Sequence, residues 1–149
     1  MSTVSARIEI GAPIERVWAT VMDPMRLGDW VTIHKSVREV SDTPLRAGST
    51  MEQALHVLGL TFKVHWTLTT LLHPRLAEWQ GGGPAHSNAI IRYELSSVSP
   101  DVTLFHYTNE FHPPGGRVGS LASRMIVGAT SEREATHSLT RLKALLERI

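Results

Sequence analysis

The chain has 149 residues, 42% of them hydrophobic, which predicts one globular domain over residues 1–149 with a single core. Fifteen lysines and arginines against fourteen aspartates and glutamates leave a formal net charge of +1, which argues against nucleic acid or an anionic membrane as the main partner. The sequence contains no cysteine, which excludes disulfides, thiolate metal sites and a cysteine nucleophile.

The N-terminal segment changes its hydrophobic period after a first strand. Apolar and polar residues alternate over 5–10, as in a half-buried strand at the edge of a sheet. Pro13 then suits the first turn of a helix, and the apolar residues over 14–21 recur at the spacing of one helical face. Asp23 followed by proline repeats this start signal, so a second, shorter helix is predicted over 25–30.

The middle of the chain is typical of an antiparallel meander. A two-residue turn at 58–59 would pair Val57 with Leu60 and give the hairpin one apolar face, on which Gln53 is the polar exception. The opposite face of the same hairpin would be polar. The predicted strands cover residues 33–40, 50–57, 60–72, 76–81, 87–97 and 102–112.

Two further expectations concern the last hairpin and the first strand of this meander. A loop at 98–100 would pair Leu95 with Thr103 and continue the inner face through the last hairpin. The facing of the strand at 33–40 stays open, because its apolar residues share their parity with charged ones. Residues 81–84 are expected to form a mobile hairpin loop.

A helical stripe follows the Pro-Gly segment at 113–116. It predicts a helix over 118–149 that packs on the sheet, with Gly128 or residues 130–131 able to bend or interrupt it. A coiled-coil seam is the alternative use of such a stripe. The stripe positions are Leu121, Met125, Gly128, Glu132, Ala135, Leu139, Leu142, Leu146 and Ile149.

This order of elements resembles the helix-grip fold of the START/Bet v 1 (SRPBCC) superfamily. The residues that carry the resemblance are IEIGAPIERVW at 8–18, Asp23-Pro24 with Trp30, NEF at 109–111 and SLTRLKALLE at 138–147. Together they look like the bacterial polyketide cyclase/dehydrase-like branch. The resemblance implies an α+β fold, in which a curved seven-stranded antiparallel sheet wraps a long C-terminal helix and two short helices follow the first strand. It also implies an internal cavity that holds a hydrophobic small molecule or lipid.

The residues of the predicted inner faces fit such a cavity. Gly128 removes side-chain volume in the middle of the stripe, where a helix that only packed on the sheet would place a large apolar residue. Gln53 and Asn109 are amides among apolar neighbours, so a ligand, a tyrosine, the backbone or a water must satisfy them. The residues expected to bind the ligand are Gln53, Trp66, Trp79, Tyr93, Tyr107, Asn109, Met125 and Gly128.

Candidates for catalysis are fewer. Glu132 is the one charged residue on the stripe, and burial would raise its pKa and make it an acid or base, although it also fits an exposed turn. Tyr93, Tyr107 and His34 are the other proton-transfer candidates, and Arg124 would meet a carboxylate at the cavity mouth. The eight histidines lack metal-ligand spacing, so neither a metal nor another cofactor is expected.

Three functions follow from the sequence. The first is binding of a small hydrophobic ligand: a lipid, a polyketide, or an aromatic or isoprenoid-like molecule. The second is a polyketide cyclase/dehydratase that moves protons during aldol closure or water loss in the same cavity. The third is a protein-interaction module like the chaperone regulators of this fold. With no signal-peptide pattern and no bilayer-length apolar window, we expect a cytoplasmic monomer or homodimer without integral membrane association.

Overall fold

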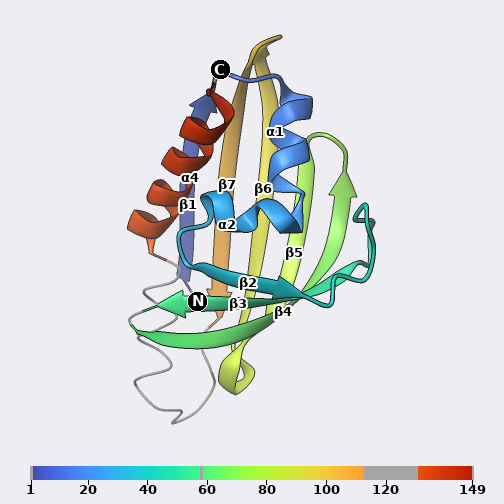
Figure 1. Cartoon of the computed structure of the whole chain (residues 1–149), viewed down its shortest axis with the longest axis vertical. Coiled ribbons are helices and arrows are strands. Elements are labelled where there is room, and N and C mark those ends of the chain that lie inside the picture. Colours follow the sequence, from blue (N-terminus) through green and yellow to red (C-terminus); the bar gives the residue numbers. More distant parts are fainter. Residues whose placement is uncertain (1, 58, 113–130, 149) are drawn as a thin grey trace.

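The computed structural model describes residues 2–57, 59–112 and 131–148, and Figure 1 shows their arrangement. The first half holds β1 (Ser2–Ile10), α1 (Ile14–Val21), the 3-10 turn η1 (Pro24–Arg26), α2 (Leu27–Trp30), β2 (His34–Arg38), β3 (Thr50–Val57) and β4 (Leu60–Leu72). The second half holds β5 (Leu76–Gly82), the 3-10 turn η2 (Pro84–His86), β6 (Asn88–Ser99), β7 (Val102–His112) and α4 (Glu132–Leu146). The expected α+β helix-grip fold is confirmed.

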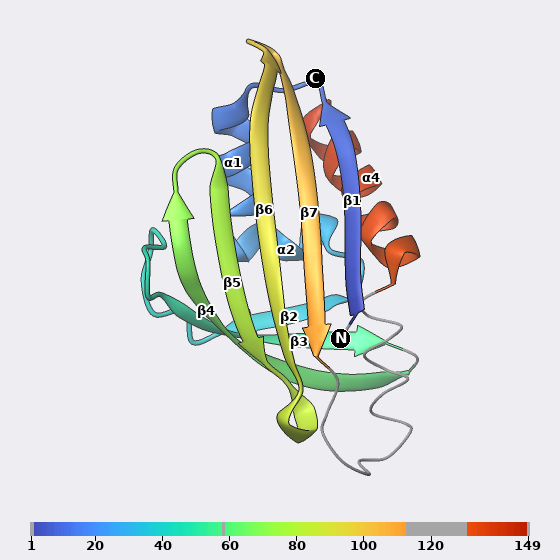
Figure 2. The ribbon, with the colours of Figure 1, turned by 180° about the vertical axis from the view of Figure 1, so that it is seen from behind.

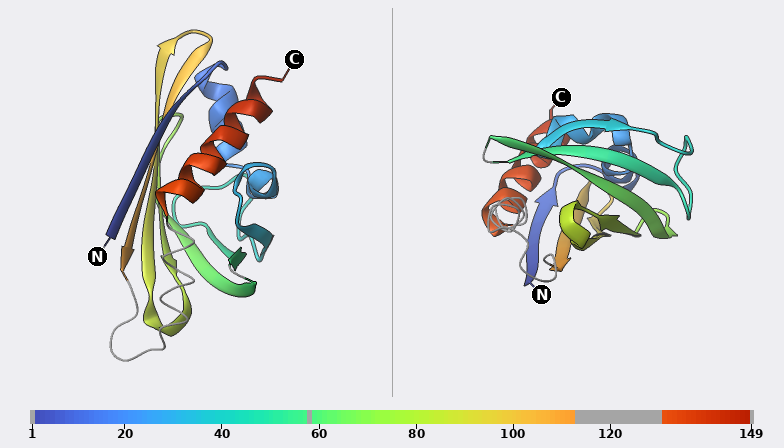
Figure 3. Two further views of the ribbon diagram at one scale, coloured as in Figure 1. Left: turned by 90° about the vertical axis from the view of Figure 1, so that its left-hand side faces the viewer. Right: turned by 90° about the horizontal axis from the view of Figure 1, so that it is seen from below.

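One antiparallel sheet of seven strands forms the frame, in the order β1-β7-β6-β5-β4-β3-β2. The sheet curls so strongly that β2, β3 and β4 run across the lower end of the other strands (Figure 3). The helices α1, α2 and α4 lie inside this curl, and the view from behind shows β6, β7 and β1 in front of them (Figure 2). The concave face of the sheet is therefore the face that the helices cover.

The pairing of β3 with β4 agrees with the sequence. Val57 lies opposite Leu60 and Gln53 opposite Val64, so the register predicted for this hairpin is confirmed.

The pairing of β6 with β7 differs from the prediction by two residues, because Leu95 lies opposite Phe105 rather than Thr103. The strands run on to Ser99 and Val102, so the connecting turn is shorter than the loop expected at 98–100. A shift of two keeps the same side chains on the inner face.

Strand β2 pairs with β3 through an irregular register. His34 lies opposite Leu55, but a shift follows it, and Val37 lies opposite Gln53. Both His34 and Val37 are half-buried, while the residues between them are exposed. The irregularity explains why neither parity of this segment is consistently apolar.

The N-terminal helices begin where the sequence predicts. Pro13 is the N-cap of α1, and the helix buries Val17, Trp18 and Val21 against the core. The side chain of Asp23 accepts a hydrogen bond from the backbone N–H of Met25 at 2.9 Å, which opens the turn η1. This second helical piece continues into α2 and buries Leu27 and Trp30.

The C-terminal helix begins later than predicted. Ser131 has an extended backbone (φ −71°, ψ 150°), and its hydroxyl accepts from the N–H of Glu134 at 3.1 Å, so a new helix starts here. The helix expected over 118–149 therefore does not run unbroken through Ser131, which is one of the positions where the sequence allowed an interruption. Residues 118–130 lie outside the described residues. Within 2–57, 59–112 and 131–148, no helix is long and apolar enough to cross a membrane.

Candidate functional site

A cavity of about 120 Å³ lies between the concave face of the sheet and the helices α2 and α4. Strands β3 to β7 form one wall, and α2, the segment after it and the first turns of α4 form the other. Most of the wall is apolar, which suits a molecule with little exposed polarity. Its apolar lining includes Leu27, Trp30, Val31, Ile33, Met51, Leu55, Phe62, Val64, Trp66, Trp79, Ala89, Ile91, Phe111, Ala135 and Leu139.

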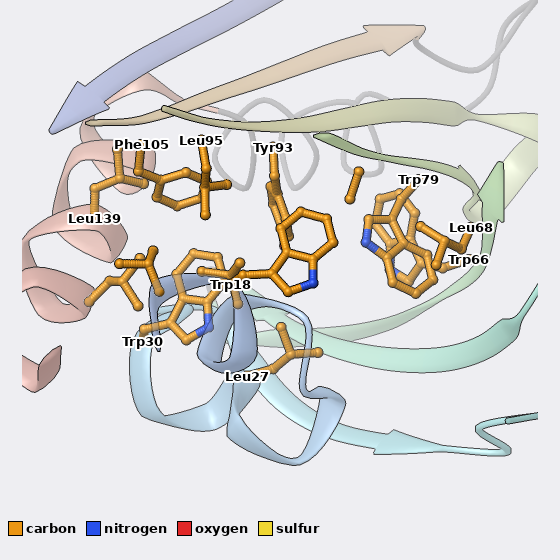
Figure 4. Packing of buried hydrophobic residues seen from close by; sticks show 14 of the residues in the cluster. Trp18, Leu27, Trp30, Trp66, Leu68, Trp79, Tyr93, Leu95, Phe105 and Leu139 are labelled. Carbon is orange, nitrogen blue, oxygen red and sulfur yellow. The ribbon is translucent and has the colours of Figure 1, made fainter. Parts of the chain in front are cut away.

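Aromatic rings close the cavity where the helices meet β6 and β7. Trp30 packs edge-on against Tyr93 with 5.9 Å between ring centroids, and against Phe105 with 6.1 Å. Figure 4 shows Trp30 and Leu27 on the helical side, with Tyr93, Leu95 and Phe105 on the strands across from them. Edge-to-face contacts of this kind hold rings in defined orientations, so this end of the cavity has a fixed shape.

Gln53 is satisfied by other side chains of the cavity wall. Its Oε1 accepts a hydrogen bond from the indole N–H of Trp66 at 2.9 Å, and its Nε2 lies 2.9 Å from Nδ1 of His34. Because an indole N–H can only donate, Oε1 must face Trp66 and the Nε2 group must donate to His34. His34 is therefore neutral with its proton on Nε2, and burial lowers its pKa, which favours the same form.

Asn109 and the two tyrosines form a second polar group, on β6 and β7. Tyr93 and Tyr107 are direct cross-strand partners with ring centroids 6.2 Å apart. The Nδ2 of Asn109 donates to the hydroxyl of Tyr107 at 3.3 Å, while its buried Oδ1 has no hydrogen-bond partner in the described part of the chain. Burial raises the pKa of Tyr107 to about 12 and that of Tyr93 further, so both hydroxyls keep their protons at neutral pH.

A carboxylate enters the cavity wall from the first turn of α4. Glu134 is half-buried, and its Oε2 accepts from the hydroxyl of Thr32 at 2.5 Å. The backbone N–H of Thr32 in turn donates to the hydroxyl of Ser138 at 3.1 Å. These bonds connect α4 to the segment between α2 and β2 and hold the carboxylate in one orientation. Glu134 was not among the residues singled out in the sequence.

Gly81 makes room for the indole of Trp66. It belongs to β5, directly opposite Trp66, and not to the hairpin loop expected at 81–84. A Cβ at this position would lie 2.5 Å from two carbons of the Trp66 ring and 2.8 Å from Val64. Only glycine therefore fits there with the ring in place. Gly83 and Pro84, which do belong to the turn, also line the cavity.

Of the eight residues expected to bind a ligand, six line the cavity: Gln53, Trp66, Trp79, Tyr93, Tyr107 and Asn109. Met125 and Gly128 lie outside the described residues, as does Arg124. Glu132 is exposed on α4, which agrees with the exposed turn and not with a buried position on the stripe, the two alternatives that the sequence left open. It is the first residue of a helix that starts at Ser131, where an exposed carboxylate interacts favourably with the positive helix end.

The sequence contained a signal for Glu134. Ser131 and Glu134 have the Ser-x-x-Glu spacing of a helix N-terminus, which would have fixed the start of the helix and hence its phase. The partners of Gln53 had no such signal, because His34 lies on a strand with irregular register. In the described part of the chain, no three His, Asp or Glu side chains come together as metal ligands would.

Comparison with known proteins points to one family. The family model for polyketide cyclase/dehydrase and lipid transport matches residues 1–147. Among solved structures, an aromatase/cyclase from Streptomyces sp. R1128 has a TM-score of 0.76 at 18% identity, covering 99% of this chain and 94% of that one. A START superfamily protein from Mycobacterium smegmatis has a TM-score of 0.76 at 14% identity, covering 97% of both chains. At these identities the two structures establish the fold alone.

Two curated sequences from Mycobacterium tuberculosis, each described as a toxin, are 29% identical to this chain over 83 residues. The match covers 56% of this chain, and the chain spans 58% of the length of these relatives.

Proposed function

The chain belongs to the polyketide cyclase/dehydrase and lipid transport family, and we propose that it binds a small, largely apolar molecule in the cavity between the sheet and α4. The observation that supports this most is the combination of a mostly apolar cavity with a buried amide oxygen on Asn109 that has no partner within the described ranges. An unpaired buried acceptor costs about 1–3 kcal/mol, and a ligand that donates to it would recover this.

The surrounding contacts support binding of a ligand with a defined orientation. Trp66 is held by Gln53, Tyr93 is packed against Trp30, and Glu134 is held by Thr32. Side chains that are fixed before the ligand arrives lose little conformational entropy when it binds. Small-molecule sites typically combine apolar walls with a few such positioned polar groups.

Native mass spectrometry tests this proposal directly. We would purify the protein from its own host, or incubate it with that host's lipid extract, and look for a bound mass beyond the 16.5 kDa chain. Ala89→Phe would fill the cavity, since Ala89 lines it on β6. Ala144→Phe, on the exposed side of α4, is the matched control.

The expected result is a retained molecule in the wild type and in Ala144→Phe, and its loss in Ala89→Phe with an unchanged circular dichroism spectrum. Equal retention by both variants would move the ligand out of this cavity. A chain that carries no molecule and takes none from the extract would contradict the binding proposal.

The second candidate function is cyclisation or dehydration of a poly-carbonyl chain, and Glu134 is the observation that favours it. A carboxylate in the wall of an apolar cavity is a suitable general base for removing a proton next to a carbonyl. The likeness to an aromatase/cyclase is compatible with this role. Turnover of such a chain by the wild type, and its loss in Glu134→Gln with ligand binding retained, would favour catalysis over binding alone.

A further inference from the structure

The cavity wall has an acidic character that bears on the kind of ligand it accepts. Among the described residues that line the cavity, Glu134 is the one with a formal charge. Its carboxylate is fixed by the hydroxyl of Thr32, so it does not turn away freely when a ligand enters. A ligand carboxylate or phosphate placed beside it would be repelled, in surroundings that screen charge poorly.

The N-terminus of α4 does not offset this repulsion. A helix N-terminus normally attracts anions through its free N–H groups. Here the hydroxyl of Ser131 already accepts from the N–H of Glu134, and Glu132 and Glu134 both lie in the first turn. The positive end of the helix is therefore occupied by the chain's own acceptors.

His34, the imidazole in contact with the cavity wall, does not supply a cation. It accepts from Gln53 through Nδ1, and burial lowers its pKa. To become charged it would place a second N–H against the amide N–H of Gln53 and lose that hydrogen bond. His34, on the far side of Gln53 from Trp66, thus contributes no positive charge to the cavity wall at neutral pH.

The unpartnered atom of Asn109 points in the same direction. Asn109 is 5% exposed and lines the cavity, and no donor among the described residues reaches its Oδ1. A hydroxyl or an N–H group of a ligand can donate to it, whereas a carboxylate or a phosphate diester can only accept.

We infer that the ligand of this cavity is a neutral molecule bearing a hydroxyl or N–H donor, and that Glu134 discriminates against carboxylate and phosphate ligands of the same size. The inference rests on the proposed binding function and specifies its ligand class. The cavity should therefore accept hydroxylated aromatic or alicyclic molecules and bind free fatty acids and phosphorylated lipids more weakly.

Three probes with the same ring system test the inference: 2-naphthol, 2-methoxynaphthalene and 2-naphthoate at neutral pH, measured by titration calorimetry and tryptophan fluorescence. We expect 2-naphthol to bind the wild type. The dissociation constant of 2-naphthoate should be at least about tenfold higher than that of 2-naphthol. The methyl ether keeps the oxygen but lacks the donor, so it should bind several-fold more weakly than 2-naphthol. Asn109→Leu should abolish that difference.

Glu134→Gln is the decisive variant, and Glu132→Gln is its control. Both remove one negative charge from the first turn of α4, but only Glu134 lines the cavity. In Glu134→Gln the affinity for 2-naphthoate should rise at least about fivefold relative to 2-naphthol, whereas Glu132→Gln should leave the ratio within about twofold.

Failure of the inference is distinguishable from failure of the proposed function. Tighter or equal binding of 2-naphthoate by the wild type, or an equal change of the ratio in both variants, would overturn the inference while leaving a binding cavity. If none of the three probes binds the wild type although native mass spectrometry shows a retained molecule, the inferred ligand class is wrong and the cavity still binds. If no molecule is retained either, the proposed function fails and the inference fails with it.

Discussion

Replacing Gln53 by leucine should destabilise the fold by removing the hydrogen-bond partner of a buried indole. Gln53 is 6% exposed and Trp66 is 5% exposed, and 2.9 Å separates the indole Nε1 from the Gln53 Oε1. In Gln53→Leu the indole N–H stays buried without an acceptor, which costs about 1–3 kcal/mol. His34 loses its donor as well, but it is half-buried and can turn to water. Leucine recovers part of the loss by apolar burial, so we expect a net loss of about 1–2 kcal/mol.

A double-mutant cycle with Trp66→Phe isolates this hydrogen bond from the effects of changing side-chain shape. Phenylalanine has no N–H, so in that background Gln53→Leu leaves no donor unpaired, and its cost should fall by about 1 kcal/mol or more. The matched cycle uses Trp79→Phe, because Trp79 is equally buried in the cavity wall and makes no hydrogen bond to Gln53 in the described part of the chain. That cycle should give a coupling energy below about 0.5 kcal/mol.

Urea denaturation followed by circular dichroism measures both cycles, with the slope m checked for constancy across the variants. The same losses should lower the melting temperature by about 2–4 °C for each kcal/mol. Two results would refute the reasoning: a Gln53→Leu cost below about 0.5 kcal/mol, or equal coupling energies in the two cycles.

Three further outcomes follow from the same structure. Gly81→Ala should lower the free energy of unfolding by about 1–3 kcal/mol in urea denaturation, because its Cβ would overlap the facing indole ring of Trp66. Gly82→Ala is the control: a Cβ there has no atom within 4 Å and should change stability by less than about 0.5 kcal/mol, and equal losses in the two variants would contradict the overlap. Tyr93 is buried and Tyr107 is half-buried, and burial raises the pKa of both hydroxyls, that of Tyr107 to about 12. No tyrosinate absorbance should therefore develop near pH 10 while the fold persists, and a tyrosine that titrates there would argue against this burial. Burial lowers the pKa of His34, so as the pH falls the unfolded chain protonates this histidine before the folded chain does. The contribution of His34 to the free energy of unfolding is therefore complete above about pH 6.5 and declines below it. His34→Gln should make the decline of stability with falling pH shallower, and an unchanged pH profile would count against a neutral His34.

The two long hairpins show what a hydrophobic pattern can and cannot determine. For β3 and β4 the two-residue turn leaves one register that keeps both faces consistent, and that register is present. For β6 and β7, registers that differ by two residues place the same side chains inward, so the pattern distinguishes them poorly. The difference depends on the turn, where the strands continue to Ser99 and Val102.

The candidate site divides in a similar way. Inward parity on the strands was enough to place Gln53, Tyr93 and Asn109 at the cavity, because a strand's side chains alternate with a fixed period. The phase of a helix depends instead on where it begins. Extending one stripe upstream through Ser131 pointed to Glu132, while the helix that starts at Ser131 presents Glu134 to the cavity.

The hydrogen-bonding pattern of the cavity favours binding over proton transfer as the proposed role. A general acid or base must exchange protons near neutral pH. Tyr93 and Tyr107 do so only at high pH because burial raises the pKa of each, and His34 is engaged through its acceptor nitrogen by Gln53. Glu134 then remains as the carboxylate on which a catalytic role would depend. In the part of the cavity wall that the structure describes, Glu134 is held by the hydroxyl of Thr32, an arrangement that suits the orientation of a donor-bearing ligand.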